Sequence, residues 1–293
     1  MNWRTLVGLT AAVIAVSFGA PLARLTHAAP LAVAMWRMTL SAALLLPVAA
    51  ARGGLRIDSG HRRAVLLAGV LLGLHFGFWI PSLWMTSVSA SVVLVTTAPL
   101  WVLLMSPKLL GARIGGRNLV SFVIALAGVV LIVGGDFRMS PRALAGDAMA
   151  LAGAWGVAGY MVVGKKLRGK VPLVGYLALV YGIAAAVLIA AVAGLGVSAW
   201  PASRLAWLPL IGMAVGPTLM GHSLLNWALA HTPAYRVNLA VLFEPVLASV
   251  WTWLLVGEAP PAHVVPGAVC ILGALALECL PRGTPVSTGP SDG

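Results

Sequence analysis

The sequence of 293 residues has few charged side chains and very few acidic ones. Charged residues make up 9% of the chain, with 7 Asp and Glu against 19 Lys and Arg, whereas 60% of the residues are hydrophobic. This composition excludes a soluble globular protein. Apolar runs of about 20 residues recur along the chain, and this pattern predicts an all-α polytopic membrane protein.

The excess of basic residues does not indicate a nucleic-acid partner here. In a soluble chain the formal net charge of +12 would suggest one. Nearly all of these residues lie in short loops between apolar runs, so we expect no nucleic acid. The two cysteines, Cys270 and Cys279, share one apolar segment and have neither metal nor redox spacing. We therefore expect no metal site and no cofactor.

Motifs that would indicate an intramembrane enzyme are also absent from the sequence. It contains no His-Glu-x-x-His motif, no paired aspartates and no Ser/His dyad at helical spacing. No predicted strand precedes any of the glycines, which excludes a nucleotide-binding loop. The expectation is a protein that is not an enzyme.

The apolar runs predict ten membrane spans joined by short loops, so neighbouring spans are antiparallel. An even number of spans places both termini on one side of the membrane. Lys and Arg number 14 in the loops on that side and 4 on the other, which predicts cytoplasmic termini in a bacterial-type inner (plasma) membrane. The tail at 281–293 is rich in Gly, Pro, Ser and Thr and is predicted to be a disordered cytoplasmic segment. The expected spans are 6–22, 31–50, 64–84, 88–106, 117–134, 147–164, 172–193, 206–229, 237–256 and 263–280.

The two halves of the chain match each other segment by segment. In the pair of segments 64–84 and 206–229, a shift of 143 residues aligns Gly69 with Gly212 and Gly73 with Gly216. A shift of 146 aligns Pro99 with Pro245. We predict two five-helix repeats, at 6–134 and 147–280. Because five is odd, the second repeat is inserted upside down, as in alternating-access transporters with a central site.

An acid and a proline near the middle of the span at 237–256 mark the strongest candidate for function. A carboxylate at the centre of a membrane span costs about 2.5–3.5 kcal/mol on insertion scales, so Glu244 is expected to face protein or a water-filled cavity. Glu244 is the candidate for proton coupling, and a purely structural acid is the alternative. Pro245 and Pro99 are expected to kink their helices. Arg37, whose side chain does not lose its proton, is interpreted as a structural or anchoring charge, and direct contact with the substrate is the alternative.

Polar and aromatic residues at helical spacing predict the walls of a substrate cavity. Thr218, His222 and Asn226 form one stripe on the span at 206–229, and His75 and Trp79 lie four residues apart on the span at 64–84. Packing roles are the alternative for each histidine. The other predicted cavity residues are Thr97, Trp101 and Trp155, the aromatic ones because their ring faces suit apolar or cationic groups.

These features make the chain resemble ten-helix members of the drug/metabolite transporter superfamily with two EamA domains. The resemblance covers about residues 6–280, and it departs from the family where Leu-Gly-Glu is usual at the end of the fourth span. It implies a basket of helices around a central cavity. The residues that carry it are Ser17–Phe18–Gly19, Arg37, Ala98–Pro99, Trp155–Gly156, Glu244–Pro245 and Leu255–Val256–Gly257–Glu258, with Leu110–Gly111–Ala112–Arg113 at the departure.

Taken with the resemblance, the sequence predicts a proton-coupled exporter of amino acids or related small metabolites that works by alternating access. Efflux of organic cations or drugs is the first alternative. An intramembrane enzyme and a subunit that moves lipid-linked sugars are weaker alternatives. The expected partners are the lipid bilayer and a small-molecule substrate, and a homodimer is left open.

Overall fold

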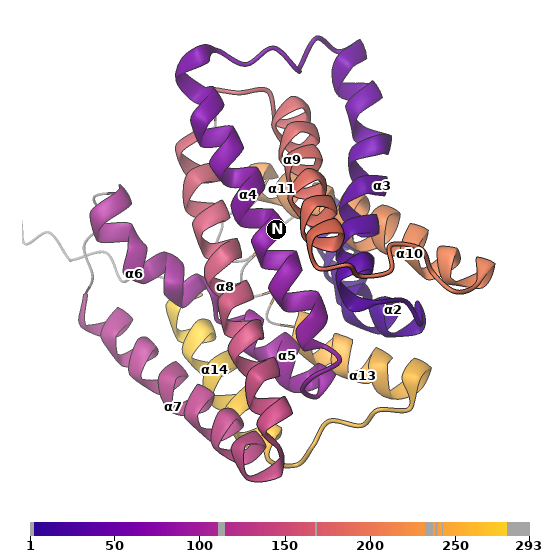
Figure 1. Ribbon diagram of the computed structural model, residues 1–293. Helices are drawn as coiled ribbons and strands as arrows, with labels where there is room; N and C mark the ends of the chain where they lie inside the picture. The colour runs from indigo at the N-terminus through magenta and orange to yellow at the C-terminus, as the bar shows by residue number, and fades with distance from the viewer. Residues whose placement is uncertain are drawn as a thin grey trace, which may run out of the picture.

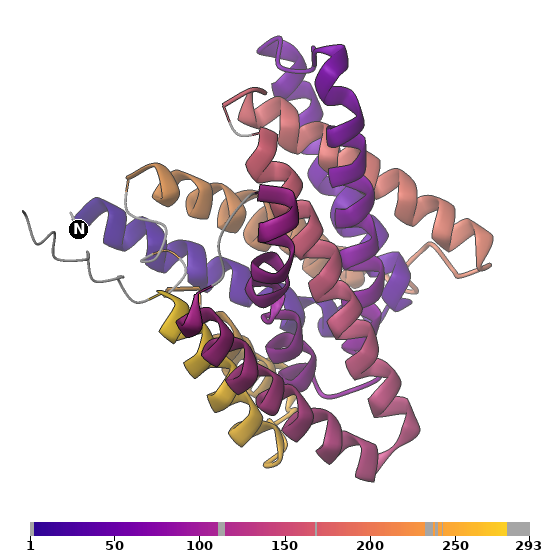
Figure 2. The ribbon, with the colours of Figure 1, turned by 90° about the vertical axis from the view of Figure 1, so that its left-hand side faces the viewer.

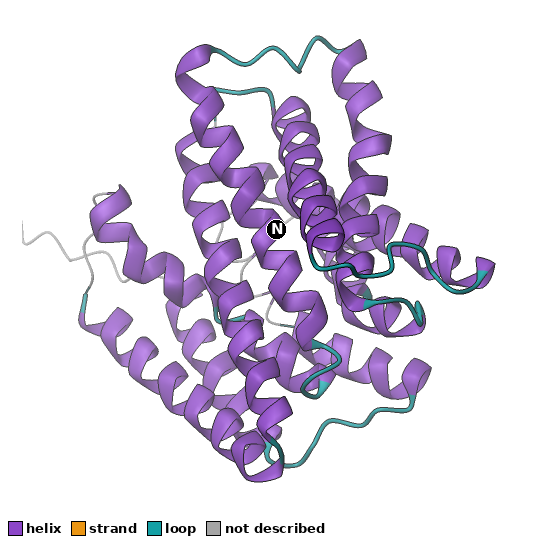
Figure 3. Cartoon of the chain, in the orientation of Figure 1, coloured by secondary structure: helices purple, strands orange, loops and turns teal. Residues whose placement is uncertain are grey.

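The computed structural model describes residues 3–110, 115–167, 169–231, 237, 240–241 and 243–279, apart from the side chains of 106, 110, 136–139, 226, 229–230 and 278–279. Throughout these residues the regular structure is helical (Figures 1 and 3). In the first half the helices are α1 (Trp3–Ser17), α2 (Gly19–Leu25), α3 (Pro30–Ala51), α4 (Ser59–Ser82), α5 (Val88–Val95), α6 (Ala98–Leu110) and α7 (Gly116–Met139).

The second half continues the same architecture. Its helices are α8 (Pro141–Leu167), α9 (Leu173–Gly194), the 3₁₀ turn η1 (Arg204–Ala206), α10 (Trp207–Met213), the π-helix η2 (Ala214–Gly221), α11 (His222–His231), α13 (Glu244–Val256) and α14 (Val264–Cys279).

Ten segments of the described chain are candidates to cross a membrane. Eight are long and apolar enough by length and composition, and the helices at Glu244–Val256 and Val264–Leu277 are shorter but apolar. All ten overlap the predicted spans in order. The prediction of an all-α polytopic membrane protein is confirmed.

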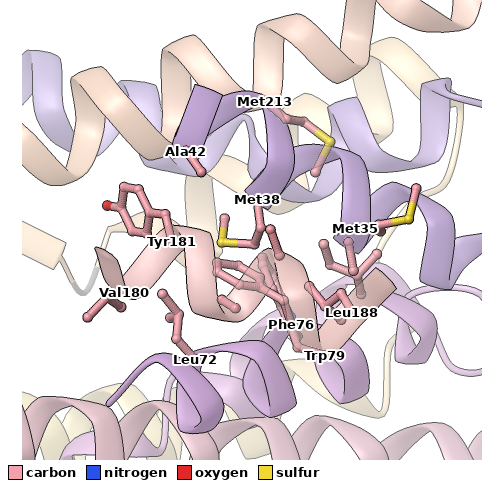
Figure 4. Packing of buried hydrophobic residues seen from close by; sticks show 14 of the residues in the cluster. Met35, Met38, Ala42, Leu72, Phe76, Trp79, Val180, Tyr181, Leu188 and Met213 are labelled. Carbon is pink, nitrogen blue, oxygen red and sulfur yellow. The ribbon is translucent and has the colours of Figure 1, made fainter. Parts of the chain in front are cut away.

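The main core lies where α3, α4 and α9 meet, with α8 packed along α4 (Figure 1). Its largest fully buried side chains include Met38, Leu188 and Met213 (Figure 4). Lipid cannot drive helices together by apolar burial, so close packing and small residues do this work. At one point α9 approaches the turn after α3 so closely that a Cβ on Gly175 would overlap the carbonyl oxygen of Gly54.

A second core joins α7 to α14, which lie side by side in both views (Figures 1 and 2). Close contact between their backbones depends on a pair of glycines. A Cβ on Gly128 would lie 2.7 Å from the carbonyl oxygen of Gly267, and one on Gly267 would lie 2.6 Å from that of Gly128. The two helices also contact the neighbouring part of the molecule, α14 through α5 and α7 through α8.

Where the sequence predicts helices kinked at Pro99 and Pro245, the structure has breaks. The helix α5 ends at Val95, and α6 begins at Ala98 with Pro99 in its first turn. Likewise α13 begins at Glu244 with Pro245 next to it. Proline has no N–H to donate and fixes φ near the helical value, so it is favoured at the first positions of a helix. Each proline therefore starts a half-helix.

Candidate functional site

Four irregular stretches of backbone are the first sign of a site. The chain turns at Phe18 between α1 and α2, at Thr96 and Thr97 between α5 and α6, and at Phe243 before α13, and η2 is wound as a π-helix. Irregular backbone at membrane depth is tolerated where it is enclosed by protein or lines a water-filled cavity. Half-helices of this kind form the binding sites of many transporters.

Arg37 lies at the centre of this region with its guanidinium held from several sides. Its side chain is 3% exposed. Its Nε donates a hydrogen bond of 2.9 Å to Thr218 Oγ1, and its Cζ lies 4.4 Å from the ring centroid of Phe76 and 5.8 Å from that of Trp79. Its Nη1 is buried without a hydrogen-bond partner among the residues described. A cation so placed keeps a donor that could bind an anionic group.

The π-helix positions the partner of Arg37. Thr218 Oγ1 donates a hydrogen bond of 3.0 Å to the carbonyl oxygen of Met213, five residues earlier, which fits the wider π turn. Its oxygen then accepts from Arg37 Nε. Single-turn π distortions are common at functional sites. The π turn therefore explains how Thr218 comes to bind Arg37, and helical spacing in the sequence does not reveal that turn.

His75 and Trp79 of α4 pack against each other, and Trp79 lies beside Arg37. Their rings stack with centroids 5.6 Å apart and planes 13° apart, and His75 Nδ1 is hydrogen-bonded to the carbonyl oxygen of Gly153 at 2.9 Å. The close contact between α4 and α8 depends on Gly153, because a Cβ at this position would lie 3.0 Å from Trp79 Cβ. Trp79 Nε1 is a second buried donor that has no partner among the described residues.

Besides Tyr181 of α9, two titratable side chains act electrostatically on Arg37. Glu244, half-buried at the start of α13, interacts electrostatically with Arg37. His222, at the start of α11, interacts electrostatically with both Arg37 and His75. Within the described residues, Arg37 and Glu244 do not form an ion pair in direct contact. We name Arg37, His75, Trp79, Thr218, His222 and Glu244 the central cluster.

Among the remaining predicted cavity residues, hydrogen-bond and ring contacts link Thr97, Trp101 and Trp155 with one another. Trp101 donates a hydrogen bond of 3.2 Å to Thr97, and its ring lies 5.8 Å from that of Trp155. Trp155 is 55% exposed. It follows Gly153 by two residues, about 200° around α8, so it points away from His75. The side chain of Asn226 and the tail at 281–293 lie outside what the structure describes.

A group of contacts that sequence analysis missed joins the ends of four helices. Arg24, at the end of α2, pairs with Glu258, just beyond α13, with Nη2 and Oε2 2.9 Å apart. Arg24 Nη1 also donates to the carbonyl oxygen of Leu83 after α4, at 2.7 Å. Glu258 Oε1 accepts from the backbone N–H of Val88, which starts α5, at 2.7 Å. We call Arg24 and Glu258 with these partners the clamp.

The shape of the chain beyond α13 sets the position of Glu258. Gly257 ends α13 with a φ of +78°, a left-handed conformation that glycine adopts without strain. The next residue is thereby turned back toward Arg24. The glycine and acid at the end of the apolar span were the only sequence signals that pointed to this contact.

An apolar groove of about 370 Å³ lies next to the central cluster, at Pro217 beside Thr218. Its lining comes from α1, α2, α10 and η2 and includes Phe18, Gly216 and Pro217. Pro217 precedes Thr218, so this wall of the groove backs onto the partner of Arg37. Phe18 also stacks on Trp251 of α13, with ring centroids 5.0 Å apart. The groove therefore borders two of the irregular stretches.

Comparison with known proteins agrees with this architecture. The profile of the EamA-like transporter family matches residues 3–134 and 144–278. YdfC, an uncharacterized transporter of Bacillus subtilis (strain 168), is 26% identical over 216 residues, which cover 72% of this chain and 69% of that protein. A solved crystal structure, 23% identical, aligns with a TM-score of 0.63 over 94% of this chain and 95% of its own, and this likeness shows the fold alone.

Proposed function

We propose that this chain, which belongs to the EamA-like transporter family, is a proton-coupled exporter of amino acids or related small metabolites. Its membership of the family makes it an integral membrane transporter and not an enzyme. As a transporter it contacts the lipid bilayer and a small-molecule substrate. The observation that carries the proposal is the placement of Glu244 at the start of a half-helix, within electrostatic range of Arg37.

In this mechanism Glu244 takes up and releases a proton while the central cluster faces one side of the membrane and then the other. Arg37 keeps its charge throughout and is the charged group that acts on Glu244 among the described residues. Of the helices packed against α13, α1 carries Arg4 near its start, α2 carries Arg24 in the clamp and α5 carries no titratable side chain. Glu244 is thus the carboxyl group suited to coupling.

The two halves rock about the central cluster, and this motion exposes the cluster first to one side of the membrane and then to the other. We take these halves to be inverted repeats at 6–134 and 147–280, with the breaks at Pro99 and Pro245 as the bends of the moving helices. The excess of basic residues in alternate loops supports an inner (plasma) membrane location with cytoplasmic termini. The clamp would then lie on the outer side and close the site to the outside. A homodimer stays a prediction from the sequence.

The proposal is tested with the purified full-length protein in proteoliposomes under an imposed pH gradient. Radiolabelled amino acids, organic cations and nucleotide sugars are each measured for movement against the direction of proton flow. Proton-driven movement of at least one amino acid is the expected result. Movement of organic cations alone would favour the drug-efflux alternative, and movement that ignores the pH gradient would refute proton coupling.

A further inference from the structure

We propose that Arg37 and Glu244 together hold the headgroup of a zwitterionic amino acid, with the carboxylate of the substrate on Arg37 and its ammonium group on Glu244. The inference rests on the proposed transport function and names the substrate class of the same site. It assigns Arg37 a binding role, where the sequence favours a structural one.

The first step of the argument is the incomplete hydrogen bonding of a fixed guanidinium. Thr218 holds Nε, and the rings of Phe76 and Trp79 lie 4.4 Å and 5.8 Å from Cζ, so the side chain has little freedom to find another partner. Buried Nη1 has no partner among the described residues. A guanidinium offers a planar fork of donors that matches a carboxylate, and a buried charge without such a partner is unfavourable.

One neighbour of the buried Nη1 is a residue without a side chain. A Cβ on Gly19 would lie 3.6 Å from Arg37 Nη1 and 3.7 Å from the ring of Trp79. Gly19 follows the turn between α1 and α2, one of the irregular stretches. The unpartnered edge of the guanidinium therefore faces a break between helices, where rocking of the halves would open a path to it.

The second step is the separation of the two opposite charges. Glu244 interacts electrostatically with Arg37, yet within the described residues the two side chains are not in direct contact as an ion pair. Had they paired directly, each would have satisfied the other and left no charged position for a ligand. Apart from each other, they offer one cationic and one anionic position to the same molecule.

The charge balance then selects among substrates. A zwitterion adds a negative group next to Arg37 and a positive group next to Glu244, so both buried charges gain a partner. An organic cation leaves Arg37 unpaired, and a simple carboxylate leaves Glu244 without a cationic partner, so that Glu244 would hold a proton instead. Since the ammonium group and a proton would compete for the same carboxylate, substrate and proton would occupy the site in turn, which is the exchange that a proton-driven exporter requires.

The test uses the wild-type protein in detergent and measures its thermal stabilisation by each of the twenty proteinogenic amino acids. Every amino acid that stabilises is then compared with two analogues that keep its side chain, the decarboxylated amine and the deaminated acid. We expect both analogues to bind about tenfold or more weakly, because each loses a charge-assisted contact. An analogue that binds as well as the amino acid would overturn the proposal, and so would stabilisation by none of the twenty.

Two substitutions sharpen the result. Arg37→Lys keeps the positive charge but loses the planar fork, and we expect it to weaken amino acid binding about tenfold or more while leaving binding of the amine unchanged. Arg62→Lys is the control, because Arg62 also uses Nε for one hydrogen bond, to the carbonyl oxygen of Ile57. Equal losses in both variants would contradict a specific role for Arg37.

Transport separates this inference from the proposed function. If organic cations are moved by the pH gradient while no amino acid binds, the protein remains a transporter and the zwitterion site is wrong. If no substrate class is moved, the proposed proton-coupled transport fails as well.

Discussion

Neutralising Glu258 is expected to open the protein on the side of the clamp. Glu258→Gln keeps the shape of the side chain and an acceptor for the N–H of Val88 but removes the charge that pairs with Arg24. The two side chains are 24% and 25% exposed, so the pair is neither fully solvated nor fully buried. The clamp joins the ends of α2, α4, α5 and α13, so its loss favours the conformation in which these ends separate.

The size of the effect follows from the geometry of the pair. Two unit charges about 4 Å apart attract each other by about 4 kcal/mol at an effective dielectric constant of about 20. Desolvation and the ordering of two long side chains offset most of this, which leaves about 1–2 kcal/mol for a half-buried pair. The equilibrium between the closed and open conformations should shift by about 5- to 30-fold.

Thiol labelling measures this shift directly. In a background with Cys270→Ser and Cys279→Ser, Ser17→Cys places a thiol at the break after α1, where the serine is buried. The rate of labelling by a membrane-impermeant maleimide added outside intact cells should rise about 5- to 30-fold with Glu258→Gln. Arg142→Gln is the control, since exposed Arg142 donates to the carbonyl oxygen of Trp84 nearby. An unchanged rate in the Glu258 variant would refute the role of the clamp.

Two further predictions concern stability in detergent. Gly175→Ala should destabilise the protein by about 2 kcal/mol or more, because the new methyl group overlaps the carbonyl oxygen of Gly54. Gly194→Ala, which meets nothing within 4 Å, should have almost no effect, and equal melting temperatures for the two variants would contradict the close approach. Thr218→Val should cost about 1–3 kcal/mol, because it leaves a buried guanidinium N–H without an acceptor. Thr39→Val, which loses only a bond to its own helix, should melt at a higher temperature than Thr218→Val.

Much of the fold is predictable because a membrane imposes simple constraints on a sequence. Apolar runs of about 20 residues must be helices in lipid, so the ten segments could be placed with their ends at most seven residues from those in the structure. The breaks were harder to foresee. A proline in an apolar run indicates a disturbed helix, but the same pattern fits a kink or a new helix, and the packing around Pro99 and Pro245 decides between them.

The central cluster shows both the reach and the limits of helical spacing. His75, Trp79 and Thr218, which helical spacing predicts as cavity residues, all act on or contact Arg37, and their role in a cavity stays a prediction. Trp155 was placed with them on the basis of residue type, whereas the glycines of α8 face α4 and turn Trp155 away. The bond between Arg37 and Thr218 joins residues 181 positions apart and depends on a π turn, which no local pattern specifies.

The clamp was missed for a similar reason. Arg24 and Glu258 are 234 residues apart, and each alone looks like a loop charge. Only the left-handed turn at Gly257 directs the acid toward the end of α2. Contacts that depend on how several helix ends meet are set by tertiary packing and are beyond the reach of sequence periodicity.

Transport by Glu244→Gln in proteoliposomes tests the central claim most directly. The variant keeps the size of the side chain and cannot exchange a proton, so substrate transport driven by a pH gradient should fall to the rate seen without a gradient. Asp58→Asn, which neutralises an exposed carboxyl group outside both the central cluster and the clamp, should still respond to the gradient. Full pH-driven transport by Glu244→Gln would contradict proton coupling through this carboxyl group and, with it, the account of the central cluster.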